Sequence, residues 1–281
     1  MIQEYKPGRR MGDEIVFVGC GNMGGALAAG YGRRVASAHL VVVDPDARKA
    51  RGMLPDDGRV TILPAIEAVG DLVPAATVLA VKPQSMGEVL PLVASLPAAA
   101  GLVVSIAAGT GVDTIRAALP RARIVRAMPN TPALLGAGVT GLWGGDEVTA
   151  EDRRVCEGLF GAVGEVHWVG AEREMDAVTA LSGGGPAYVF AFTEALTDAA
   201  ARLGLPPAQA AALARATVAG AAAMLAVPGA DPTALKAAVR SPKGTTDAAL
   251  RVFEAEGALQ TLVATALDAA FRRAGELGRG E

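Results

Sequence analysis

The fold is decided by the stretch Glu14-Ile-Val-Phe-Val-Gly-Cys-Gly-Asn-Met-Gly-Gly-Ala-Leu27, close to the start of the 281-residue chain. Four apolar residues from Ile15 predict a short buried strand, and an Ala/Leu-rich helical run follows. Between them, Gly19, Gly21 and Gly24 form the pattern G-x-G-x-x-G. In such a turn the first glycine permits the tight bend, the second lets a pyrophosphate approach the backbone, and the third lets the helix pack closely. The free N–H groups of the helix then face the phosphates, so the stretch predicts a dinucleotide site.

Strand patterns continue at regular intervals after this motif, with helical segments between them. The expected strands cover residues 40–43, 60–63, 77–81, 102–106, 123–126, 138–143 and 164–169. This order predicts an α/β fold in which residues 13–170 form a Rossmann-like, doubly wound, mostly parallel sheet. Ligands of such sheets lie at the carboxyl ends of the strands, where several short motifs of this chain are expected.

The pattern changes near residue 170, where strand-like runs stop. Ala/Leu-rich helical runs follow at 175–181, 187–203, 207–226, 232–239, 246–254 and 258–277. Residues 171–281 are therefore predicted to form an all-helical domain, and residues 1–12 a loose polar extension. A helical domain of roughly 110 residues with few aromatics buries little apolar surface alone, so pairing with a second copy is expected. An ordinary alanine-rich bundle is the alternative.

Composition excludes several classes of protein. The net charge is −3 and the sequence has no basic stripe, so nucleic acid is not an expected partner. Two cysteines and two histidines cannot supply a four-ligand zinc site of the usual spacing, so no metal is expected. Cys20 and Cys156 are interpreted as small core residues, and His39 and His167 as structural residues. Without a long apolar segment at the N-terminus, and with an arginine inside the apolar run 208–227, we expect a cytoplasmic protein without a membrane span.

A second candidate site is the segment Ser241-Pro-Lys-Gly-Thr-Thr246, which leads directly into a predicted helix. The backbone N–H groups of Gly244 and Thr245, with the hydroxyl of Thr246, would form an anion site at the helix N-terminus. An ordinary N-cap by a Ser or Thr side chain is the alternative, and the local sequence alone favours it.

Several segments match one known family in order and spacing. They are Gly-Cys-Gly-Asn-Met-Gly at 19–24, Ala-Val-Lys-Pro at 80–83, Ser-Ile-Ala-Ala-Gly at 105–109, Met-Pro-Asn-Thr-Pro at 128–132, Leu-Ser-Gly-Gly-Gly-Pro-Ala-Tyr at 181–188 and Ser-Pro-Lys-Gly-Thr-Thr at 241–246. With these segments the chain resembles pyrroline-5-carboxylate reductase over nearly its whole length. The resemblance implies an NAD(P)H-dependent enzyme that reduces 1-pyrroline-5-carboxylate to L-proline, the last step of proline biosynthesis. It also implies a helical domain that binds substrate and interlocks with a second subunit, in a homodimer or a higher oligomer of dimers.

The glycine motif and the resemblance together assign residues to each ligand. The cofactor residues are Gly19, Cys20, Gly21, Asn22, Met23 and Gly24 at the pyrophosphate, and Ala80, Val81, Lys82, Pro83, Ala107 and Ala108 at the ribose and nicotinamide. The resemblance places the substrate carboxylate on Gly244 and Thr245, with Ser241 in the same loop. It gives a catalytic role to Thr246, beside the ring nitrogen, and to Glu172, which matches an acidic residue of the family near the substrate.

Asp44 ends the second predicted strand and bears on the choice of cofactor. A carboxylate at this place accepts hydrogen bonds from a ribose 2′-hydroxyl and repels a 2′-phosphate. NADH is therefore predicted over NADPH, although Arg48 and Lys49 follow closely and oppose this preference.

Three residues depart from the family pattern. Gly184 stands where serine is usual, and Arg240 and Lys243 stand where small residues are usual. The last two flank the candidate anion loop, so a related cyclic imino acid, or a substrate with a second anionic group, remains an alternative. Two further alternatives are a non-catalytic dinucleotide-sensing protein and a deazaflavin-dependent or β-hydroxyacid-type reductase of similar layout.

Overall fold

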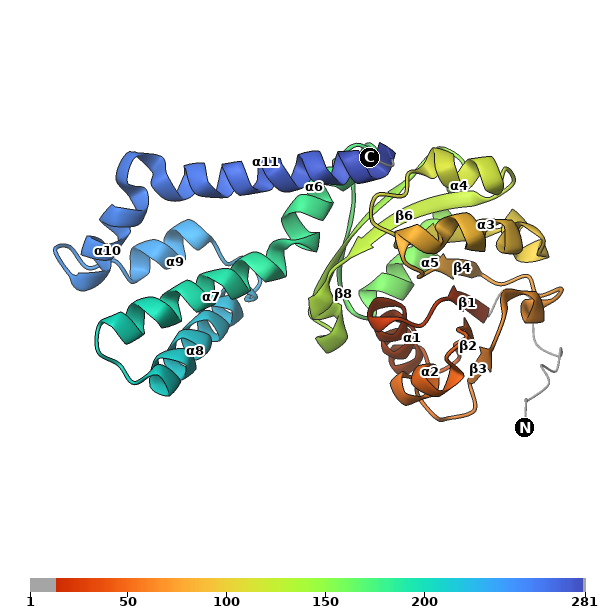
Figure 1. Cartoon of the computed structure of the whole chain (residues 1–281), viewed down its shortest axis with the longest axis horizontal. Helices are drawn as coiled ribbons and strands as arrows, with labels where there is room; N and C mark the ends of the chain where they lie inside the picture. The colour runs from red at the N-terminus through yellow and green to blue at the C-terminus, as the bar shows by residue number, and fades with distance from the viewer. Residues whose placement is uncertain (1–13, 280–281) are drawn as a thin grey trace. The chain divides into compact units, whose positions relative to one another are not determined.

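The computed structural model describes residues 14–279, which form two compact units (Figure 1). The first contains residues 14–184 and 270–279, and the second contains Gly185–Ala269. This division differs from the boundary expected at residue 170. Helix α6 (Glu174–Val178) belongs with the sheet, because Val178 packs so closely on Gly141 that a Cβ there would lie 2.5 Å from the Val178 side chain. The extension expected at residues 1–12 lies outside the described residues.

An eight-stranded sheet forms the first unit, in the order β3-β2-β1-β4-β5-β6-β7-β8. The strands are β1 (Glu14–Val18), β2 (His39–Val43), β3 (Val60–Leu63), β4 (Ala76–Leu79), β5 (Leu102–Ser105), β6 (Arg123–Pro129), β7 (Gly138–Gly144) and β8 (Gly164–Trp168). All neighbours are parallel except β6 and β7. The predicted mostly parallel, doubly wound sheet is therefore confirmed. The strand order reverses between β1 and β4, which is where such sheets bind ligands.

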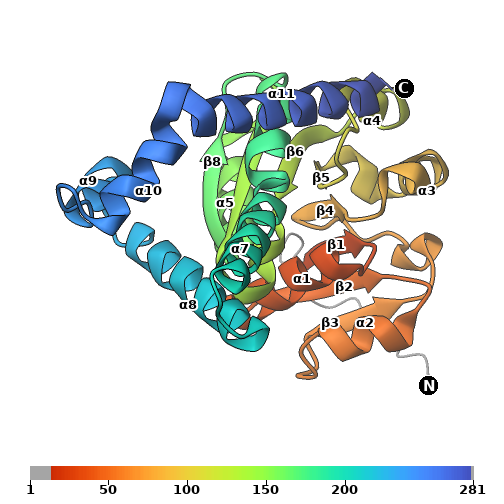
Figure 2. The same ribbon diagram turned by 60° about the vertical axis from the view of Figure 1, so that its left-hand side comes forward.

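Apolar layers cover both faces of this sheet. Successive residues of β1 alternate between them, with Ile15 and Phe17 in one layer and Val16 and Val18 in the other. Helices α1 (Asn22–Arg34), α2 (Ala47–Met53) and α5 (Ala150–Gly161) supply the first layer, and α3 (Met86–Ala94) and α4 (Val112–Ala118) the second (Figure 2). Cys156 is fully buried in the first layer, and this burial raises the pKa of its thiol to about 12. It is a core residue, as expected.

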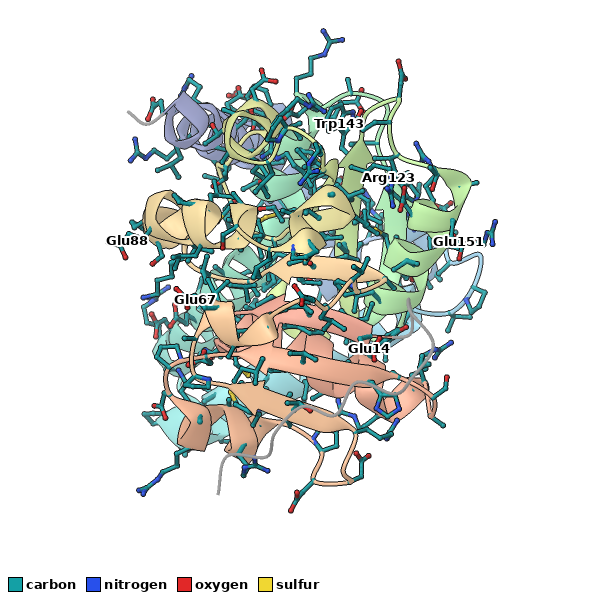
Figure 3. All side chains as sticks on the ribbon, turned by 90° about the vertical axis from the view of Figure 1, so that its right-hand side faces the viewer. Glu14, Glu67, Glu88, Arg123, Trp143 and Glu151 are labelled. Atoms are coloured by element: carbon teal, nitrogen blue, oxygen red, sulfur yellow. The ribbon has the colours of Figure 1, made fainter. Side chains whose placement is uncertain are left out.

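A partly buried ion pair links α5 to the sheet. Arg123, labelled in Figure 3 on β6, donates to Asp152 of α5 with an Nε–Oδ2 distance of 2.7 Å. Burial opposes ionisation of Asp152, but hydrogen bonds from Arg123 and Thr149 outweigh it and hold the pKa of this carboxyl below its ordinary value. Asp152 also accepts from the backbone N–H of Thr149, so it closes the N-terminus of its own helix.

The second unit is all-helical, as the sequence predicted. It contains α7 (Gly185–Arg202), α8 (Pro207–Leu225), α9 (Pro232–Ala238), α10 (Thr245–Glu254) and the first part of α11 (Ala258–Arg279), with α7 and α8 packed side by side (Figure 1). Large apolar side chains are exposed on it, including Phe190 at 65% and Leu262 at 68%. Within residues 14–279, α8 alone is long and apolar enough to cross a membrane by length and composition, with a mean hydropathy of 1.3.

Candidate active site

The glycine loop joins β1 to α1 where the strand order reverses. Gly19 has a φ of +101°, in the left-handed region, and a Cβ on it would lie 2.7 Å from the carbonyl oxygen of Ala80. A Cβ on Gly24 would lie 2.5 Å from the Gly19 carbonyl oxygen, whereas a Cβ on Gly21 would meet nothing within 4 Å. The turn and close-packing roles predicted for Gly19 and Gly24 are confirmed. Gly21 borders the open space that the approach of a pyrophosphate requires.

Helix α1 presents its N-terminus to that open space. Gly21 is the N-cap, and no side chain caps the helix. Within the described part of the chain, the N–H groups of Asn22, Met23 and Gly24 have no hydrogen-bond partner, and the first bonded N–H is that of Gly25, to Gly21 at 2.8 Å. Several free N–H groups at the positive end of a helix dipole fit a pyrophosphate, so this loop suits a nicotinamide dinucleotide.

Asp44 anchors the same loop from the end of β2. Its Oδ2 accepts from the Cys20 N–H at 2.7 Å, and its Oδ1 accepts from the Asp46 N–H at 2.9 Å. Each carboxylate oxygen has further lone pairs, which a ribose hydroxyl could use. Burial, reinforced by the Asp44 carboxylate, raises the pKa of the Cys20 thiol to about 11, so the thiol is neutral at physiological pH. No local pattern in the sequence predicted this contact between Asp44 and Cys20.

The other predicted cofactor residues converge on the same edge of the sheet. The Ala80 N–H bonds to Val18 at 2.8 Å, and the Ile106 N–H bonds to Leu79 at 3.1 Å, so the ends of β1, β4 and β5 are adjacent. At this edge of the sheet, Lys82 and Pro83 are exposed to solvent, whereas Ala107 is buried. The loop after β5 packs against the C-terminal part of α11, since a Cβ on Gly109 would lie 2.9 Å from the Leu277 side chain.

The N-terminus of α10 forms the second candidate region. Gly244 is the N-cap without a side-chain cap, so the alternative of a Ser or Thr cap is wrong. The Gly244 N–H bonds to the Ser241 carbonyl at 2.9 Å, because the segment closes into a tight turn. It is therefore not the free donor that was predicted. In the chain as described, the N–H groups of Thr245 and Thr246 have no partner, nor does the half-buried Thr246 hydroxyl.

Glu172 links the start of α4 to β6 through two hydrogen bonds. Its Oε1 accepts from the Val112 N–H, at the start of α4, at 2.8 Å and from Arg126 Nη1 at 2.9 Å. It thus caps α4 and ties that helix to β6, and these contacts favour a structural role over the predicted catalytic one. No group of three or more His, Cys, Asp or Glu residues that could hold a metal ion occurs within residues 14–279.

Comparison with known proteins decides the family. A family model for pyrroline-5-carboxylate reductase dimerisation matches residues 172–277, and one for coenzyme F420-dependent NADP oxidoreductase matches residues 14–109. Pyrroline-5-carboxylate reductase of Pseudomonas aeruginosa is 40% identical over 266 residues, which are 94% of this chain and 96% of the relative. The chain belongs to the pyrroline-5-carboxylate reductase family.

Solved structures of this reductase family match across both units. A pyrroline-5-carboxylate reductase from Coxiella burnetii has a TM-score of 0.86 at 35% identity, and the match covers 95% of this chain and 99% of that one. The Plasmodium falciparum pyrroline carboxylate reductase, solved with NADP bound, has a TM-score of 0.77 at 28% identity and covers 96% and 100%. The expected NAD(P)-dependent oxidoreductase class and the helical dimerisation domain are confirmed.

Proposed function

We propose that this protein reduces 1-pyrroline-5-carboxylate to L-proline, the last step of proline biosynthesis, with hydride from NADH or NADPH. The main support is that α1, which follows the glycine loop, and α10, which follows the loop at 241–246, both have open N-termini. Helices α1 and α10 both begin at a glycine N-cap without a side-chain cap. One such end suits a pyrophosphate and the other suits the carboxylate of a cyclic imino acid.

Several other helices are closed at this end. Asp46 caps α2, Thr149 caps α5, and Asp231 caps α9, each through its side chain. Helix α4 also begins at a glycine, Gly111, but Glu172 accepts from its first N–H. Helices α3, α6 and α8 also lack a side-chain cap, but they begin at Ser85, Arg173 and Pro206, whereas α1 and α10 begin at a glycine whose following N–H groups are not taken by a side chain.

In the proposed reaction the bound dinucleotide supplies the hydride, and the chain binds, orients and protonates. The N–H groups at the start of α1 hold the pyrophosphate, and residues 80–83, 107 and 108 border the ribose and nicotinamide. The N–H groups of Thr245 and Thr246 hold the substrate carboxylate, with Ser241 and Gly244 shaping the loop. The Thr246 hydroxyl accepts from the protonated ring nitrogen and later relays a proton to the amine.

The Asp44 carboxylate bears on the choice of cofactor, and the helical unit bears on the assembly. The Asp44 carboxylate beside the glycine loop favours NADH. The matched dimerisation domain supports a homodimer, and we extend this to an assembly in which a second copy covers the exposed apolar surface of the helical unit, α8 included. We also propose that the protein is cytoplasmic and that neither a membrane nor nucleic acid is among its partners.

The test is oxidation of NADH and NADPH by the purified protein with pyrroline-5-carboxylate, followed by cofactor absorbance. Saturable turnover with L-proline as product is expected. Faster turnover with another cyclic imino acid would select that substrate instead. Tight NAD(P)H binding without turnover of any imino acid would favour the dinucleotide-sensing alternative.

A further inference from the structure

A buried acid lies at the helix end where the proposed function needs an anion to bind. Asp247 occupies the first turn of α10 and is 7% exposed. A carboxylate at this place would repel a substrate carboxylate that binds at the same helix end. Asp152, at the equivalent position of α5, turns towards its own helix end and accepts from the N–H of the N-cap Thr149 at 2.9 Å. The corresponding N–H in α10 is that of Gly244, which bonds to Ser241.

In α10 the acid is held by two arginines instead. Asp247 Oδ1 accepts from Arg240 Nε at 2.8 Å, and Oδ2 accepts from Arg251 Nε at 3.1 Å. No backbone N–H in the first turn of α10 is among its hydrogen-bond donors within the described residues. The Arg240 hydrogen bond, with the charge of Arg251, holds the pKa of Asp247 below its ordinary value, so the carboxylate is ionised at neutral pH.

Arg240 is the better placed of the two arginines. Its side chain is 32% exposed, compared with 72% for Arg251, so water screens its charge less. Its Nη1 also donates to Glu254 Oε2 at 2.9 Å, so the Arg240 side chain links the first turn of α10 to the last residue of that helix. Arg240 directly precedes Ser241, so the same contacts fix the start of the anion loop.

We propose that Arg240 is a positioning residue for the substrate carboxylate. It neutralises Asp247 and holds that side chain away from the Thr245 and Thr246 N–H groups, which leaves the helix end open to an external carboxylate. This inference rests on the proposed function and deepens it. It also gives a reason for an arginine at a position where the family pattern has a small residue.

The decisive variant is Arg240→Gln, which leaves Asp247 charged without its principal partner. The KM for pyrroline-5-carboxylate should rise about 10- to 100-fold, as expected for losing a charge-assisted bond to an anion, while the KM for NAD(P)H stays within about twofold. Lys236→Met is the matched control. Lys236 donates to Glu254 at 2.8 Å in the same network but does not touch Asp247, so both KM values should stay within about threefold.

A second substitution separates charge compensation from a structural role. The double variant Arg240→Gln/Asp247→Asn removes the charge that Arg240 compensates, so the substrate KM should return to within about threefold of wild type. If Arg240→Gln leaves the substrate KM unchanged, or if the double variant stays as impaired as the single one, the proposal is overturned. Should Arg240→Gln not fold, Arg240→Lys retains the charge with one contact and should raise the KM by a smaller factor.

Calorimetric titration of the protein with L-proline, in the presence of oxidised cofactor, measures binding of a carboxylate ligand separately from turnover. Arg240→Gln should weaken this binding, and the double variant should restore it. A wild type that binds L-proline but does not oxidise NAD(P)H with pyrroline-5-carboxylate would refute the proposed function while the Arg240 comparison still holds. A wild type that binds no such carboxylate would refute both.

Discussion

Replacing Gly21 with alanine tests the glycine loop directly, because the structure leaves room for the new methyl group. Gly21 has φ −71° and ψ −174°, which any residue adopts, and its Cβ would meet nothing within 4 Å. The substitution should therefore leave the fold intact, because a gain of about 0.4–1 kcal/mol from the lower entropy of the unfolded chain offsets the poorer N-cap that alanine provides. The methyl group would occupy the space where a pyrophosphate approaches the N–H groups of α1. Losing one hydrogen bond to a charged group costs roughly 1.5–3 kcal/mol, so the Kd for NAD(P)H should rise about 10- to 150-fold.

Gly19→Ala is the matched contrast. With φ at +101° and its Cβ 2.7 Å from the Ala80 carbonyl oxygen, this variant should lose at least about 1–3 kcal/mol of stability. Scanning calorimetry should show a melting temperature lowered by roughly 2–12 °C, whereas Gly21→Ala should melt within about 2 °C of wild type. Fluorescence titration gives the Kd for NAD(P)H. A stable Gly21→Ala variant that binds cofactor as wild type does would refute the assignment of the pyrophosphate to this loop.

Three further predictions concern the Thr246 hydroxyl, the choice of cofactor and the buried thiols. Thr246→Ala should lower kcat/KM for pyrroline-5-carboxylate by about one to two decades with little change in melting temperature, because its hydroxyl caps no helix; a destabilised but fully active variant would contradict this. Asp44→Asn keeps an acceptor for the Cys20 N–H but loses the charge, so the ratio of kcat/KM with NADH to that with NADPH should fall; a wild type much faster with NADPH would overturn the underlying preference. The folded state raises the pKa of Cys20 to about 11 and of Cys156 to about 12, above the ordinary 9.0. Both therefore bind their protons more tightly in the folded state, so their contribution to stability is complete below pH 9.0 and is lost as the pH rises towards those values. Urea midpoints measured across this range should fall with pH, and less steeply in Cys156→Ala; a fall of equal slope in that variant would contradict the assignment.

Local signals in the sequence determined the scaffold and the glycine turn between β1 and α1. Apolar runs of strand length predicted the strands of the first unit, because a strand buried on both faces is apolar at successive positions. The spacing of Gly19, Gly21 and Gly24 predicted the turn, since the conformation of a turn depends on the residues inside it. The change to alanine-rich runs near residue 170 predicted the helical region for the same reason.

Contacts between residues distant in the sequence were decided only by the tertiary structure. Asp44 bonds to Cys20 across 24 positions, Glu172 bonds to Val112 across 60, and residues 270–279 return to the sheet unit at the end of the chain. Seven positions separate Arg240 from Asp247, yet their pairing depends on how α10 packs beside the end of α9. Periodicity describes one element at a time and carries no information about which side chains meet when elements pack. The sequence by itself therefore determined the scaffold and the glycine turn, whereas at residues 241–246 the local sequence favoured a helix cap. The packed structure decided that α10 begins without a side-chain cap and that Arg240 holds the acid in its first turn.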